Sequence, residues 1–83
     1  MTEENIKIRL LSPGAAPAEY SAVYFVVPCE KGEMCIMNNH APIAAVVAEG
    51  EMRIICGEGT KKIPVKGGFM CVRNNLAEIF EDA

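Results

Sequence analysis

The sequence GEMCIMNNHAPI, residues 32–43, holds the only histidine of the chain. It places a carboxylate, a short apolar run, a polar bend and a proline next to one another. Residues 33–37 have the pattern of a short strand, and Asn38–Asn39 form a bend of the kind that tolerates left-handed backbone. Pro42 begins the next segment, which is short and apolar. The stretch therefore predicts two strands joined by a polar turn that contains His40.

Short strands are predicted on both sides of this stretch. Residues 6–11 alternate apolar and basic side chains, and residues 23–27 are apolar on both faces. Residues 13–18 are rich in Pro, Gly and Ala, and we expect an irregular or edge segment that crosses from one sheet to another. Further strands are predicted downstream, at residues 52–56, 60–66, 69–73 and 76–81. Pro64 lacks a backbone N–H, so its strand lies at an edge or turns the side without a hydrogen-bond donor outward.

This spacing of short strands and turns, without a convincing amphipathic helix, predicts an all-β sandwich or barrel. Eighty-three residues make one small domain. The net charge is −3, which argues against a nucleic-acid binder with a basic face. No apolar run reaches the length of a membrane-spanning helix, and residues 1–5 lack the features of a signal peptide.

The four cysteines do not form a Cys-x-x-Cys pair, so a structural zinc site is poorly supported and no metal site is predicted. The absence of a signal peptide favours a reducing compartment, in which disulfides are rare. Cys56 and Cys71 both fall within apolar strand patterns. We expect them to act as small core residues.

Few residues are suited to catalysis. Glu33 and His40 could meet across a turn and share a proton, and Cys35 with His40 could form a nucleophile pair. A single histidine in a polar bend more often anchors its own loop by hydrogen bonds, and we favour that interpretation. No catalytic residue and no cofactor are predicted, which leaves a non-enzymatic sandwich with an apolar outer patch at Tyr24 and Val26.

The string in residues 32–43 is similar to the G-E-L-G-I-L-P-N-H-A-P-L signature of the epsilon subunit of F-type ATP synthase. The similarity continues through Ser12-Pro13 in the opening strand, Val26-Val27-Pro28 before the signature and VKGGF at residues 65–69. It covers residues 6–82, and the signature around His40 is its most specific part.

The resemblance implies a flattened ten-stranded β-sandwich, which together with the strand pattern predicts about eight to ten mainly antiparallel strands. It also implies a non-catalytic rotor subunit of a proton-translocating ATP synthase. Such a subunit couples rotation of the membrane c-ring to the gamma subunit of the central stalk. It would be a peripheral protein at the cytoplasmic face of the bacterial plasma membrane, attached through the complex. The alternative is a β-sandwich interaction module unrelated to ATP synthase.

The resemblance also assigns contacts to single residues. Glu33 matches the carboxylate that faces the polar loops of the c-ring. Ser12, His40 and Ala41 match positions on the side that faces gamma. Our own inference from the residues adds Tyr24 and Val26 as a possible apolar interface.

The chain departs from the family pattern at several positions. Asn38 replaces a proline, so the bend is expected to be less rigid. Cys29 and Cys35 replace glycines, and the backbone there must differ if either glycine needed a positive φ. The helical hairpin with which such subunits usually continue is not in the sequence. We therefore expect a single domain over residues 1–83 that neither inhibits ATP hydrolysis through that hairpin nor binds ATP there.

Overall fold

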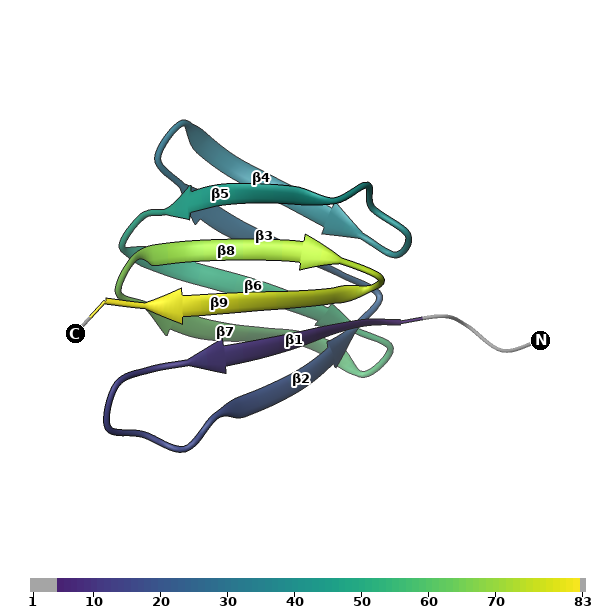
Figure 1. Ribbon diagram of the computed structural model, residues 1–83. Helices are drawn as coiled ribbons and strands as arrows, with labels where there is room; N and C mark the ends of the chain where they lie inside the picture. The colour runs from purple at the N-terminus through teal and green to yellow at the C-terminus, as the bar shows by residue number, and fades with distance from the viewer. Residues whose placement is uncertain (1–4, 83) are drawn as a thin grey trace.

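The computed structural model describes residues 5–82 and contains nine β-strands and no helix in that range. Figure 1 shows them as two layers that lie face to face. The strands are β1 (Ile6–Leu11), β2 (Ala18–Ala22), β3 (Tyr24–Cys29), β4 (Gly32–Met37), β5 (Ile43–Val47), β6 (Gly50–Cys56), β7 (Gly59–Val65), β8 (Gly68–Arg73) and β9 (Leu76–Glu81). Within the described residues there is no helix long and apolar enough to cross a bilayer.

The two layers belong to one hydrogen-bonded sheet that folds back on itself. Its strand order is β2-β1-β9-β8-β5-β3-β6-β7, with β4 paired to the other side of β3. In Figure 1 the front layer is β2-β1-β9-β8-β5, and the back layer is β4-β3-β6-β7. Only β1 and β9 pair in parallel; the other pairs are antiparallel. This confirms the predicted all-β sandwich of mainly antiparallel strands.

Backbone hydrogen bonds join the layers where the chain turns from one to the other. Val23 donates to the carbonyl of Ile55 at 2.9 Å between β2 and β3, and Ala48 donates to the carbonyl of Pro28 at 2.9 Å between β5 and β6. The predicted crossing at residues 13–18 is wrong, because β1 and β2 pair within the front layer. The strand β2, whose residues alternate in burial, begins at Ala18. The short side chain of Ala18 gives only a weak apolar signal, so the sequence pattern did not indicate this strand.

The core lies between the layers and follows the period-2 alternation of the strands. Each fully buried Ile, Val, Phe or Met side chain contributes about 1.5–3 kcal/mol relative to exposure. No polar or charged residue among those described is buried. The largest side chains without exposed surface are Phe25, Ile6, Ile8, Ile36, Met52, Ile54, Met70, Ile79 and Val27.

The positions of Pro64, Cys56 and Cys71 can be compared with those that the sequence pattern predicts. Pro64 is exposed on β7, which ends the strand order, so the predicted edge position is confirmed. Cys56 packs partly against the core, as expected. For Cys71 the prediction of a core residue is wrong, because its neighbours on β8, Met70 and Val72, take the inward positions.

Candidate protein-interaction site

The turn at residues 38–42 carries His40 between β4 and β5. Asn39 has a φ of 63°, so the predicted left-handed bend is confirmed there. The backbone N–H of His40 donates to the carbonyl of Met37 at 3.2 Å, which closes the turn. Cys29 and Cys35, which replace family glycines, lie in regular strands without a positive φ. The strand backbone therefore accommodates both side chains.

The amide of Asn75, in the β8–β9 turn, holds the His40 turn in place. Its Oδ1 accepts the backbone N–H of Asn39 at 2.6 Å. Its Nδ2 donates to Oδ1 of Asn38 at 2.6 Å and to Oδ1 of Asn39 at 3.3 Å. These hydrogen bonds restrain the bend at the position where the family has a proline. The expected loss of rigidity at Asn38 is thus opposed by a contact from another strand pair.

His40 is half-buried at the rim of a shallow hollow. Its Nδ1 lies 2.7 Å from the carbonyl oxygen of Ala41. A carbonyl only accepts, so Nδ1 carries the proton and Nε2 is the acceptor of the neutral ring. This supports the interpretation of His40 as an anchor of its own loop. The hollow is lined by Asn39, His40, Ala41, Pro42, Asn74 and Asn75.

Glu33 lies at the other end of β4 from His40, so the two do not form an acid–base pair. At about 3.3 Å per strand residue, the four strand steps from Glu33 to Met37 alone span roughly 13 Å. Both carboxylate oxygens of Glu33 face the guanidinium of Arg53, at 3.4 Å each. This ion pair links β4 to β6 and passes over the outer side of β3. The proposed contact of Glu33 with the c-ring therefore starts from a carboxylate that already has a cation beside it.

Ser12 follows the end of β1, and its hydroxyl donates to a carboxylate oxygen of Glu81. The other oxygen of Glu81 accepts the backbone N–H of Lys66 at 2.8 Å. Because β1 runs parallel to β9, Ser12 lies near the end of β9 and Asn75 lies at its start. The structure therefore brings His40 and Ala41 together, but it separates them from Ser12 by about the length of a strand, roughly 20 Å.

Tyr24 and Val26 point outward from β3 in the back layer and are half-buried. Tyr24 lies between Met37 on β4 and Ile55 on β6. Sequence reasoning missed a more exposed apolar group on the front layer, formed by Val46, Phe69 and Phe80. The alternation on β8 and β9 contained the signal, because Phe69 and Phe80 fall on the positions opposite to the inward ones.

The described residues also bear on metal binding and on the reactivity of the buried thiol. No three His, Cys, Asp or Glu side chains among residues 5–82 come close enough to share a metal ion. All four cysteines are free, and burial raises the pKa of the Cys29 thiol. A raised pKa lowers the thiolate fraction near neutral pH and makes Cys29 less reactive.

Sequence and structure comparisons point to one family. The family model for the β-sandwich domain of the ATP synthase delta/epsilon chain matches residues 5–83. The ATP synthase epsilon chain of Leptospira borgpetersenii is 33% identical over 82 residues, which are 99% of this chain and 65% of the relative. The epsilon chain of Pelotomaculum thermopropionicum is 30% identical over 83 residues, which are 100% of this chain and 62% of the relative.

Two solved structures share the fold. A chain of the Euglena gracilis mitochondrial ATP synthase structure (OSCP, F1 and c-ring) superposes with a TM-score of 0.82 at 18% identity, over 93% of this chain and 50% of that one. A chain of the Tetrahymena thermophila mitochondrial ATP synthase structure (central stalk and c-ring) gives 0.75 at 16% identity, over 100% of this chain and 67% of that one.

The chain spans 65% and 62% of the length of the two bacterial relatives, so the match concerns a part of those proteins. Within that part the agreement runs from Asn5 to the last residue, and the strands observed are those of a sandwich. This chain therefore belongs to the β-sandwich domain family of the ATP synthase delta and epsilon chains.

Proposed function

We propose that this chain is a non-catalytic rotor component of a proton-translocating F-type ATP synthase. In this proposal it couples rotation of the c-ring to the gamma subunit of the central stalk, at the cytoplasmic face of the bacterial plasma membrane. The observation that carries the proposal is the family match over residues 5–83, supported by bacterial relatives named ATP synthase epsilon chain. It favours the rotor over an unrelated interaction module.

The fold is suited to transmitting torque. A coupling element must not deform when one end is pushed against the other. Here the core is continuous between two layers, and backbone hydrogen bonds join the layers at Val23 and at Ala48. The Cα trace measures 41 × 24 × 19 Å, long enough for separate contacts at the two ends.

The proposed contacts divide between these ends. Glu33 and Ser12 lie toward one end of the strands, whereas His40 and Ala41 lie at the other. Glu33 would contact basic or polar groups of the c-ring loops, either while it stays paired with Arg53 or in place of that ion pair. Ser12, His40 and Ala41 would contact gamma, with His40 offering Nε2 as a hydrogen-bond acceptor.

The test is co-expression of this chain with the gamma subunit and c-ring encoded in the same genome. We expect the chain to copurify with both. His40→Ala should weaken binding to gamma by roughly 5- to 100-fold, the range expected for the loss of one interface anchor. Glu33→Ala should leave gamma binding unchanged and weaken association with the c-ring. If the folded wild-type chain copurifies with neither partner, the proposal is overturned.

A further inference from the structure

Among the described residues the sheet ends at β2, at β7 and at β4, and these strands protect their free edges to different degrees. An unprotected edge strand pairs readily with a strand of another chain, and lysine and proline residues are common means of preventing this. β7 has both kinds of protection, because Lys61, Lys62 and Pro64 are all exposed on it. Its edge is therefore poorly suited to an added strand.

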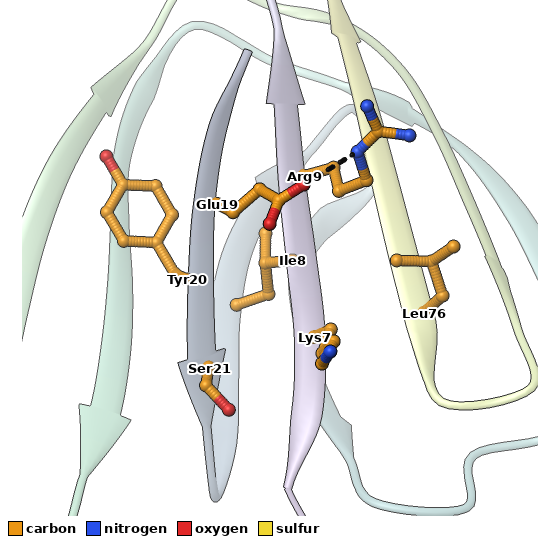
Figure 2. Close-up of a pocket in the computed structure, with 7 residues that line it drawn as sticks. All are labelled: Lys7, Ile8, Arg9, Glu19, Tyr20, Ser21 and Leu76. Atoms are coloured by element: carbon orange, nitrogen blue, oxygen red, sulfur yellow. Dashed lines mark ion pairs between the residues drawn. The ribbon is translucent and has the colours of Figure 1, made fainter.

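The edge of β2 is protected by its neighbours. The backbone carbonyl of Ser21 accepts a hydrogen bond from the thiol of Cys56 at 3.4 Å, so the end of β6 reaches this edge. Figure 2 shows Glu19 on the same strand, where it pairs with Arg9 of β1 at 3.4 Å. A charged side chain and a partly covered backbone make β2 a poor template for pairing.

The edge of β4 has none of these protections. Its sequence, GEMCIM, contains no proline or lysine and pairs with β3 residue by residue. Cys35 and Met37 are exposed on it, Met37 by 56%. Its charged residue, Glu33, is already paired with Arg53 at 3.4 Å. In Figure 1 the strand borders the back layer, and within residues 5–82 no further strand pairs with its outer edge.

The backbone of β4 directs hydrogen-bonding groups toward this edge. A two-residue turn joins β3 to β4, and in such a hairpin the pair of residues next to the turn exchanges hydrogen bonds, whereas the second pair, Pro28 with Glu33, does not. The carbonyl of Pro28 agrees with this phase, because it accepts the N–H of Ala48 at 2.9 Å, on the side away from β4. The two kinds of pair alternate along the ladder. The N–H and C=O groups of Glu33, Cys35 and Met37 therefore point away from β3.

A second copy of β4 fits this edge in a register that uses all three residues. In an antiparallel pair with its twofold axis at Cys35, the two Cys35 residues exchange hydrogen bonds, and Glu33 of each copy does so with Met37 of the other. The carbonyl of Met37 already accepts the N–H of His40 at 3.2 Å, and its second lone pair can accept another. A shift of the register leaves at least one of the three residues without a partner.

The side chains favour the same register. With Glu33 opposite Met37 of the other copy, the two carboxylates are four residues apart, roughly 13 Å along the strand. This exceeds the distance of about 8–10 Å beyond which salt screens exposed charges. A register centred on Glu33 would place the carboxylates directly opposite one another, which destabilises a strand pair. On the inner side, Met34 lies opposite Ile36 of the other copy and lines the hollow between β4 and β5, so pairing extends the apolar core.

We infer that two copies of the free chain associate through β4, antiparallel and centred on Cys35, so that their back layers form one continuous sheet. The partner is a second copy because the strand complements itself in hydrogen bonding and in charge. The contact covers Glu33 and brings the turn at residues 30–31 of one copy beside the His40 turn of the other. The pair is therefore a state of the unassembled chain, and the inference does not rest on the proposed function.

The first test measures association of the purified wild-type chain by sedimentation equilibrium with a reducing agent present. We expect a monomer–dimer equilibrium with a Kd on the order of 10–100 µM, because one short strand pair buries less than a standard interface. Cys35→Lys places two ammonium groups opposite one another and should raise the Kd at least about tenfold. Thr60→Lys is the matched control on the exposed edge strand β7 and should change the Kd by less than about twofold. A chain that stays monomeric up to about 1 mM, or equal effects of the two variants, overturns the inference.

The second test locates the contact with bismaleimidoethane, a short reagent that joins two thiols. The main product of the wild-type chain, identified by mass spectrometry, should link Cys35 of one copy to Cys35 of the other. The control combines Cys35→Ser with Lys62→Cys, which moves the exposed thiol along the same cross-strand row to the β7 edge. Its yield of linked chains should be at least about tenfold lower. Equal yields, or a main product through Cys56 or Cys71, overturn the inference.

Two features keep these tests decisive. Thermal unfolding verifies the fold of each variant, and cross-linking of the wild-type chain needs no substitution, so it stands if a variant does not fold. A dimer that Phe80→Ser dissociates and Cys35→Lys leaves intact would assign the contact to the front layer and overturn the inference. Neither test contains another subunit, so failure of the chain to bind gamma would overturn the proposed function alone.

Discussion

The two outer faces of the sandwich differ in how they treat their apolar side chains. On the back layer, Tyr24 and Val26 are half-buried, and the ion pair of Glu33 with Arg53 passes over the strand that carries them. On the front layer, Phe69 and Phe80 are close to half exposed and face one another across β8 and β9. The back face thus covers part of its own apolar surface, whereas the front face leaves it to solvent or to a partner.

The difference teaches that an outward apolar residue is not by itself an interface. Tyr24 and Val26 were the natural candidates in the sequence, because the run at residues 23–27 is apolar on both faces. Their cross-strand neighbours decide how much of each side chain stays accessible. The charged residues also depend on their cross-strand neighbours. Arg53 pairs with one carboxylate on the back face, whereas Arg9 pairs with two on the front face.

The largest expected effect comes from Gly68, which adjoins Phe69 on the front layer. Its φ is +143°, and an added Cβ would lie 2.0 Å from the carbonyl oxygen of Phe80. Gly68→Ala should therefore force β8 away from β9 and lower the free energy of unfolding by about 2–5 kcal/mol. Urea unfolding provides the measurement.

Gly57→Ala is the matched control for this change. Gly57 lies in the β6–β7 turn, without a left-handed φ, and an added Cβ there would meet open space. Its substitution should change the free energy of unfolding by less than about 1 kcal/mol, because alanine only restricts the unfolded chain. Equal losses in the two variants would show that the close approach of β8 and β9 at Phe80 does not constrain the front face.

The next largest effect is expected at Asn75. Its side chain binds the His40 turn, which connects the back layer to the front layer, to the β8–β9 turn of the front layer. Asn75→Ala removes three hydrogen bonds and places alanine at a φ of 60°, so we expect a loss of roughly 2 kcal/mol. Asn74→Ala is the control, because Asn74 has a φ of 53° but no part in the network. It should cost about 1 kcal/mol from backbone strain alone. Hydrogen exchange at the Asn39 amide should accelerate only in Asn75→Ala; acceleration in both variants would contradict the role given to the side chain.

Much of the fold could be predicted from local patterns. Alternation identified most strands, Asn38–Asn39 marked the bend, and Pro64 marked an edge strand. These features depend on residues close together in the chain. The strand at residues 18–22 was missed because alanine gives a weak apolar signal, and Cys71 was assigned to the wrong face because polarity alone did not decide the phase of β8.

The candidate site was less predictable, because its contacts join distant segments. Glu33 meets Arg53 across β3, Ser12 meets Glu81, and Asn75 meets Asn39, and each contact depends on which strands pair and in which register. Alternation tells which residues of a strand share a face but not which strands lie beside it. For the same reason the exposed group of Val46, Phe69 and Phe80 emerges only when β5, β8 and β9 are in register.

The smallest expected effect compares the ion pairs of the two faces by double-mutant cycles. On the back face, Glu33→Gln with Arg53→Gln should give a coupling energy of about 0.2–0.5 kcal/mol, because the two side chains are 55% and 39% exposed. On the front face, Glu78→Gln with Arg9→Gln should approach about 1 kcal/mol, since those side chains are 30% and 37% exposed and less screened by water. Urea unfolding at low ionic strength measures both, and 1 M salt should reduce the back-face coupling by the larger fraction. In this interpretation, the back-face ion pair is exposed to solvent and the front-face ion pair is partly buried. A back-face coupling energy equal to or above the front-face value would contradict it.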